Sequence, residues 1–126
     1  MYLSDTTVII DLLRGDKDAR GFLEKYPLMS SVSYAEVLQG ARNQKELKII
    51  ARTFEAIEIE KIDSQITNLS IELLEKYNLS HGLLFLDALI AATCIIRKKI
   101  LVTDNVKDFK FIEGLTSLSH AQAFKI

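Results

Sequence analysis

The feature that most constrains this chain is the alternation of short apolar segments with longer segments of helical period. The short segments have the length and composition of strands: 1–4 (MYLS), 27–33 (PLMSSVS), 57–62 (IEIEKI) and 100–103 (ILVT). Helical patterns occupy 6–15, 17–26, 33–42, 45–54, 63–78 and a strongly apolar stretch from about residue 87. This alternation predicts an α/β fold, a three-layer α/β/α sandwich with a mainly parallel central sheet.

Local signals mark the ends of several elements. Pro27 ends the second helical segment, because the residue before a proline is disfavoured in a helix. Ser33 and Glu36 form a capping-box pattern, which predicts that the third helix starts at Ser33. The remaining segments are assigned a turn at 80–82, a short helix or turn at 104–112 and a final edge strand at 114–118.

The composition is that of one compact domain, residues 1–126. Of these residues 48% are hydrophobic and 26% charged, and a single proline leaves no candidate linker. The single cysteine excludes an internal disulfide and suits a reducing compartment. No apolar run approaches the roughly 20 residues of a membrane span. The net charge of −1 restricts any contact with nucleic acid to a local basic patch.

Acidic residues stand where predicted strands give way to helices. Asp5 follows the first strand, and Glu36 is expected in the first turn of the helix after the second. Asp104 follows 100–103, with Asp108 one helical turn further on. In parallel sheets these positions gather at the edge where ligands bind. Asp87 joins them if its helix starts at the same edge, which would bring four or five carboxylates together.

Clustered carboxylates suggest a metal site. Each raises the pKa of its neighbours, and a bound divalent cation offsets this repulsion. Oxygen ligands suit Mg²⁺ or Mn²⁺, which can activate water for phosphodiester hydrolysis. The alternative is that each acid only caps a helix. That alternative explains Asp87 poorly, because it lies inside the apolar run LLFLDALIAA, where an unpaired carboxylate is costly.

Four segments resemble, in order and spacing, the motifs of PIN-domain ribonucleases, and most of all the VapC-type toxins of toxin–antitoxin pairs: MYLSDTTVIIDLL, SSVSYAEVLQGA, HGLLFLDALIAAT and ILVTDNVKDF. The resemblance spans nearly the whole chain. It implies a helix-flanked parallel sheet and a metal-dependent endoribonuclease that cuts structured RNA such as tRNA or rRNA. It also implies a homodimer, a small antitoxin whose tail blocks the site, and a cytoplasmic location.

The resemblance assigns roles motif by motif. Asp5 and Asp87 correspond to direct ligands of Mg²⁺ or Mn²⁺, and Glu36 to a residue that helps hold the metal or orients water. The fourth motif touches Asp104 and Asp108, as well as the intervening Asn105, and leaves open which of them reaches the metal. Thr7 departs from the family, which commonly has Asn or Ser there.

Basic and histidine residues complete the candidate set. Arg14, Arg42, Lys107 and Lys110 lie near the predicted acidic edge and are candidate RNA contacts. The basic run at 97–99 precedes the strand 100–103, at the opposite end of the sheet, and is interpreted as the C-terminal charge of a helix. His120 is expected to be exposed, and His81 to lie in a turn.

Two other functions compete with an endoribonuclease toxin. A catalytically inactive PIN-like module would bind RNA or protein without cutting, and a processing nuclease would act outside a toxin–antitoxin pair. A phospho-receiver domain is disfavoured, because it needs adjacent acids after the first strand and Asp5 stands alone. The apolar residues of 8–13 (VIIDLL) and 23–26 (LEKY) are a candidate dimer face.

Overall fold

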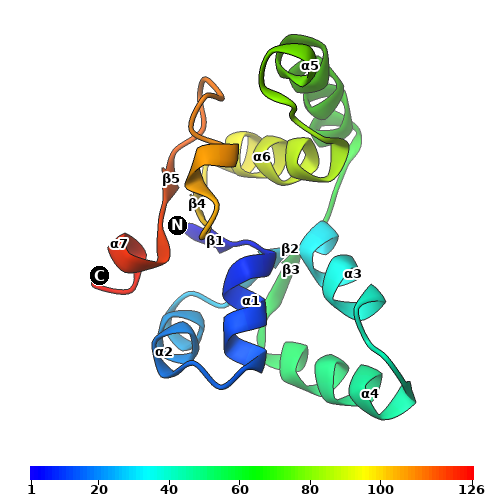
Figure 1. Ribbon diagram of the computed structural model, residues 1–126, viewed down its shortest axis with the longest axis vertical. Helices are drawn as coiled ribbons and strands as arrows, with labels where there is room; N and C mark the ends of the chain where they lie inside the picture. Colours follow the sequence, from blue (N-terminus) through cyan, green and yellow to red (C-terminus); the bar gives the residue numbers. More distant parts are fainter.

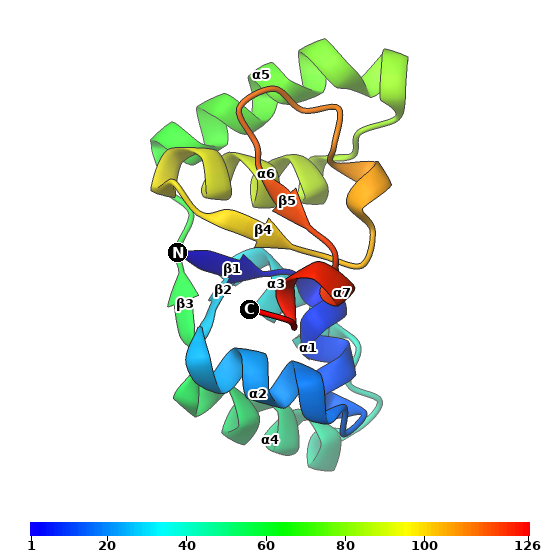
Figure 2. The same cartoon turned by 90° about the vertical axis from the view of Figure 1, so that its left-hand side faces the viewer.

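A five-stranded, fully parallel sheet forms the centre of the computed structural model, which describes residues 1–126. Its strand order is β3-β2-β1-β4-β5. The strands are β1 (Tyr2–Ser4), β2 (Leu28–Ser30), β3 (Glu58–Glu60), β4 (Ile100–Val102) and β5 (Ser117–Leu118). Leu3 pairs with Leu101 across the central ladder. Because all strands are parallel, their carboxyl ends meet at a single edge, toward which β1 and β4 point in Figure 2.

Helices cover both faces of this sheet and confirm the predicted three-layer sandwich. Figures 1 and 2 show α5 and α6 on one face and α1, α2 and α4 on the other. The helices are α1 (Thr6–Leu13), α2 (Lys17–Lys25), α3 (Ser31–Gln39), α4 (Gln44–Thr53), α5 (Ser64–His81), α6 (Phe85–Arg97) and α7 (His120–Ala123), with 3₁₀ turns η1 (Phe54–Ala56) and η2 (Val106–Asp108). None of these helices is long and apolar enough to cross a membrane.

The sheet separates two apolar cores, because alternate strand residues point to opposite faces. Leu3 and Leu101 pack in the core beneath α5 and α6. Met29 and Val102 pack in the core beneath α1, α2 and α4. Although β1, β2 and β4 have only three residues each, almost all of their side chains are buried, so these short strands contribute to both cores.

Helix α3 begins earlier than the capping-box pattern predicted. Its N-cap is Ser30, whose Oγ accepts a hydrogen bond from the Ser33 N–H (3.1 Å). The predicted start at Ser33 is therefore wrong, and Glu36 lies beyond the first turn of its helix. The strand β2 ends at Ser30, so the chain turns into a helix as soon as it leaves the sheet. A capping box does occur, but at Ser119 and Gln122, where it opens the unpredicted helix α7.

The connection between α5 and α6 is shorter than predicted. Helix α5 continues through His81, so this residue is helical and not part of a turn. Gly82 alone makes the reversal, with φ 73°, a conformation that glycine adopts without strain. Helix α6 then begins at Phe85, which places Asp87 in its first turn and not at its start.

Candidate functional site

Asp5 links the central strand to the first helix. Its backbone N–H extends the ladder by donating to the Val102 carbonyl (3.1 Å), and its side chain caps α1. Asp5 Oδ1 accepts from the Thr7 backbone N–H (2.9 Å) and from Thr7 Oγ1 (2.5 Å). Only 5% of Asp5 is exposed. Burial raises the pKa of this carboxyl, while hydrogen bonds from Thr103 and Thr7 oppose the increase.

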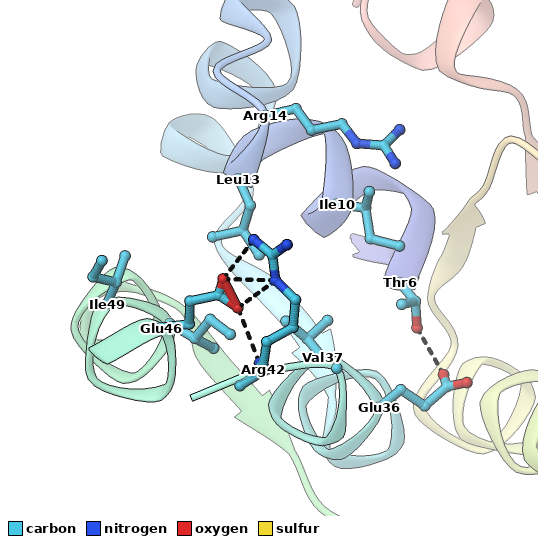
Figure 3. Close-up of a pocket in the computed structure, with 12 residues that line it drawn as sticks. Thr6, Ile10, Leu13, Arg14, Glu36, Val37, Arg42, Glu46 and Ile49 are labelled. Atoms are coloured by element: carbon cyan, nitrogen blue, oxygen red, sulfur yellow. Dashed lines mark hydrogen bonds and ion pairs between the residues drawn. The ribbon is translucent and has the colours of Figure 1, made fainter. Parts of the chain in front are cut away.

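Glu36 reaches the same edge of the sheet from the middle of α3. Thr6 Oγ1, in the first residue of α1, donates to Glu36 Oε1 over 2.7 Å. Figure 3 shows this contact, with Glu36 at one end of a groove of about 540 Å³. The hydrogen bond joins the two helices that follow β1 and β2, so a tertiary contact between α1 and α3 sets the position of Glu36 relative to Asp5.

Asp87 completes the set from the opposite layer of helices. It is half-buried in the first turn of α6, and its pKa is raised from 3.8 to about 6. Burial is the largest cause, followed by the negative charges of Glu36, Asp108 and Asp5. The negative charges of three carboxylates from separate elements therefore act on Asp87 at this edge.

The fourth motif contributes Asp108 to this group. Asp108 and Asp87 line the same small pocket of about 240 Å³. Asp104 is 69% exposed at its side chain and is not among the charges that raise the pKa of Asp87. Asn105 uses its backbone N–H to bond Thr103 Oγ1 (3.0 Å). We define the acidic cluster as Asp5, Glu36, Asp87 and Asp108.

No basic side chain neutralises the acidic cluster. The ion pairs of the protein involve other acids, and none of the four cluster members belongs to one. No three acidic, histidine or cysteine side chains converge closely enough to hold an ion as they stand. The charge and the donor chemistry nevertheless fit a hard divalent cation, because the donors are carboxylate oxygens and the charges of Glu36, Asp108 and Asp5 act on Asp87.

The candidate RNA-binding residues have different surroundings. Arg14 lines the groove beside Glu36 and makes no ion pair, whereas Arg42 lines the same groove but is bound to Glu46 (Nη2–Oε2, 2.9 Å; Figure 3). Lys107 lines the small pocket that contains Asp87. Lys110 is exposed and lines neither cavity.

Arg97 lies away from these cavities and bonds two acids of the β3–α5 connection. Its Nη2 donates to Asp63 Oδ2 (2.8 Å), and its Nε donates to Glu60 Oε2 (3.3 Å). These contacts agree with the interpretation of the basic run at 97–99 as the charged end of a helix.

Two functional candidates were missed by sequence reasoning. His120 was expected to be exposed, but it is only 9% exposed and bonds Thr7 Oγ1 through Nε2 (3.0 Å). The prediction was wrong because α7 folds back against α1. Asp11 Oδ2 lies 3.0 Å from His120 Nδ1. The spacing of Thr7 and Asp11, four residues apart on one helix, places them on one face and was the available signal. No local pattern pointed to His120.

Comparison with known proteins identifies the family. The model of the PIN domain family matches residues 2–114. Ribonuclease VapC19 of Mycobacterium tuberculosis is 32% identical over 123 residues, covering 91% of this chain and 97% of the relative. A solved toxin–antitoxin complex from Klebsiella pneumoniae contains a chain with 28% identity and a TM-score of 0.77, covering 95% of this chain and 98% of the other.

More distant structures share the fold. A DNA-bound VapBC complex from Salmonella typhimurium has a TM-score of 0.81 at 19% identity, covering 94% of this chain and 97% of the other. VapBC2 of Rickettsia felis, bound to a promoter fragment, has a TM-score of 0.80 at 24% identity, with the same two coverages. The family match and the identity to the curated relative show that this chain belongs to the PIN domain family and is of the VapC type.

Proposed function

We propose that this protein is a Mg²⁺- or Mn²⁺-dependent endoribonuclease, the toxin of a toxin–antitoxin pair, which hydrolyses phosphodiester bonds of structured RNA such as tRNA or rRNA. The observation that carries this proposal is the acidic cluster, in which three negative charges act on Asp87 and no member has a basic partner. Such a group is costly unless a cation joins it. The similarity to ribonuclease VapC19 supports the same activity.

The residues of the acidic cluster would have separate roles in metal binding and in positioning the attacking water. Asp5 and Asp87 would hold the metal from opposite helical layers, and Asp108 is better placed than Asp104 to assist Asp87. Glu36, held by Thr6, would position the metal or the attacking water. A bound Mg²⁺ or Mn²⁺ supplies a water of lowered pKa and neutralises charge on the phosphate.

The basic residues would guide the RNA backbone toward the cluster. Arg14 is the first candidate, because its guanidinium has no acidic partner and lines the groove that ends at Glu36. Lys107 lies beside Asp87 at the small pocket. Arg42 would have to leave Glu46 before contacting a phosphate, so its contribution is expected to be smaller.

The groove is also the proposed site of an antitoxin segment. The partly exposed apolar side chains of Ile10, Leu13 and Ile49 line it. The complexes from Klebsiella pneumoniae and Salmonella typhimurium contain such a partner. A segment lying there would reach Glu36 and obstruct the cluster.

We also propose a homodimer in the cytoplasm. Most of the apolar surface expected as its interface, such as Val8 and Leu23, is already used by the protein's own core.

Cleavage of total cellular RNA by the purified protein tests the proposal. We expect discrete fragments with Mg²⁺ or Mn²⁺, none with chelator, and none from Asp87→Asn. Glu72→Gln is the matched control, since Glu72 is an exposed acid on α5 that makes no ion pair. Equal behaviour of wild type and Asp87→Asn would refute the nuclease. RNA retained uncut would then favour an inactive binding module.

A further inference from the structure

A chain of polar contacts connects Asp5 through Thr7 to His120 and Asp11, which lie outside the acidic cluster. Thr7 Oγ1 contacts Asp5 Oδ1 (2.5 Å) on one side and His120 Nε2 (3.0 Å) on the other. His120 Nδ1 lies 3.0 Å from Asp11 Oδ2. The Asp104 backbone N–H also donates to Thr7 Oγ1, over 3.0 Å. The Thr7 hydroxyl therefore contacts Asp5, α7 and the loop after β4, and His120 Nδ1 adds a second contact to α1 at Asp11 and lies 4.0 Å from Asp104 Oδ1.

The hydrogens available on each group decide which group donates in each hydrogen bond. The Thr7 hydroxyl carries one hydrogen, and its two lone pairs can accept two bonds. When it donates to Asp5, it accepts from the Asp104 N–H and from His120 Nε2–H. His120 Nε2 is then the donor to Thr7, while Nδ1 faces Asp11 Oδ2 at 3.0 Å. In this arrangement every polar atom of the chain has a partner of the correct type.

The surroundings hold His120 in place. Its ring stacks on Phe124 with centroids 5.0 Å apart, and Phe124 in turn packs on Phe22 of α2 (5.5 Å). The capping box formed by Ser119 and Gln122 fixes the start of the short helix α7. A histidine that is 9% exposed and bonded at both nitrogens is therefore set in one orientation by its packing.

We propose that His120, oriented by Asp11, is a positioning residue for the metal site, acting on Asp5 through the Thr7 hydroxyl. This inference rests on the proposed function, because Asp5 is taken as a ligand. His120 fixes the direction in which the Thr7 hydroxyl donates, and this donation fixes the Asp5 carboxylate. The threonine at position 7 is thus supported by a histidine that supplies a further hydrogen bond to its hydroxyl.

Manganese affinity, measured from the EPR signal of free Mn²⁺, tests this role. Removing a partner of a metal ligand typically weakens metal binding by about 10- to 100-fold, so we expect His120→Ala to raise the Kd at least about 10-fold. His120→Gln, whose amide can donate to Thr7, should recover most of this loss. In a Thr7→Val background, His120→Ala should add no more than about 2-fold, because the two residues act through one contact.

Two further measurements separate positioning from packing. Leu73→Ala removes apolar contacts in the core beneath α5 and α6, on the other side of the sheet from His120, so it should lower Tm and leave the Mn²⁺ affinity unchanged. In the metal-free protein, Thr7→Val should shift the ¹⁵N resonance of His120 Nε2. An unshifted resonance would overturn the contact, and an equal loss of affinity in Leu73→Ala and His120→Ala would overturn the positioning role.

The outcomes also distinguish this inference from the proposed function. If wild type binds Mn²⁺, Asp87→Asn does not, and His120→Ala binds as wild type does, only the role of His120 is refuted. Additive effects of Thr7→Val and His120→Ala would refute it as well. If wild type binds no Mn²⁺ and cuts no RNA, both proposals fail together.

Discussion

Replacing Asp87 by Asn should stabilise the metal-free protein at neutral pH. The pKa of Asp87 is raised from 3.8 to about 6 by burial and by neighbouring carboxylates. One pKa unit corresponds to about 1.36 kcal/mol, so the whole shift corresponds to about 3 kcal/mol. Asp87 is only half-buried, and solvent screening reduces the expected effect to about 1–2 kcal/mol.

The sign follows from proton binding. The folded protein holds the Asp87 proton more tightly than the unfolded chain does, so the folded state loses stability as the pH rises. The destabilisation is absent below about pH 4, where both states are protonated, and complete above about pH 6. Asp87→Asn carries no charge at any pH. It should therefore exceed wild type in stability at about pH 7.5 and match it near pH 4.

Urea unfolding in chelator at the two pH values measures this difference. Asp63→Asn is the control of opposite sign, because Asp63 bonds Arg97 and the Ile66 N–H, and these contacts lower its pKa. That variant should be less stable than wild type at neutral pH. A lower free energy of unfolding for Asp87→Asn in chelator at about pH 7.5 would show that the carboxylates do not repel one another in the folded protein.

Bound metal should reverse the order of stability, so that wild type becomes more stable than Asp87→Asn. A ligand at a hundred times its Kd stabilises the folded state by about 2.7 kcal/mol. Wild type should gain this stability with Mn²⁺, while Asp87→Asn, which lacks one of the proposed ligands, should gain much less. A Mn²⁺-dependent gain of the same size in both proteins would contradict the role of Asp87 in metal binding.

Three further substitutions test other features. Ser4→Ala should raise the free energy of urea unfolding by about 1 kcal/mol, because Ser4 Oγ is buried without a partner; a loss of stability would imply an unseen contact. Gly82→Ala should lower that free energy by about 1 kcal/mol, because φ is 73° there, and an unchanged midpoint would refute this. Arg97→Ala should leave the initial rate of RNA cleavage unchanged, since its guanidinium bonds Glu60 and Asp63; a large decrease would make it an RNA contact.

Much of the fold was predictable because its signals are local. Strands β1, β2 and β4 are short apolar runs, and helices α1 and α2 show a 3.6-residue period between clear boundaries. The start of α3 was misplaced because two serines, Ser30 and Ser33, both offer a cap. Only the end of β2 decides between them. Helix α7 has four residues, too few for a period to be recognised.

The candidate site was predictable in part for a related reason. Parallel strands bring their carboxyl ends to one edge, so acids placed after them in the sequence become neighbours in space. Asp5, Asp104 and Asp108 could be grouped on this ground, whereas Asp87 follows a helix and was added through the family resemblance. The choice between Asp104 and Asp108 could not, because both follow β4 and their separation from Asp87 depends on how η2 is oriented.

The sequence by itself determined the order of strands and helices, and the acids at their junctions, since both are properties of neighbouring residues. Only the tertiary structure decided which groups face one another. His120 illustrates the difference, because it lies 113 residues from Thr7 in the chain and yet bonds its hydroxyl. No periodicity or capping pattern in the sequence predicts a contact of this kind. It arises when the packing of Phe124 against Phe22 brings α7 to the side of α1.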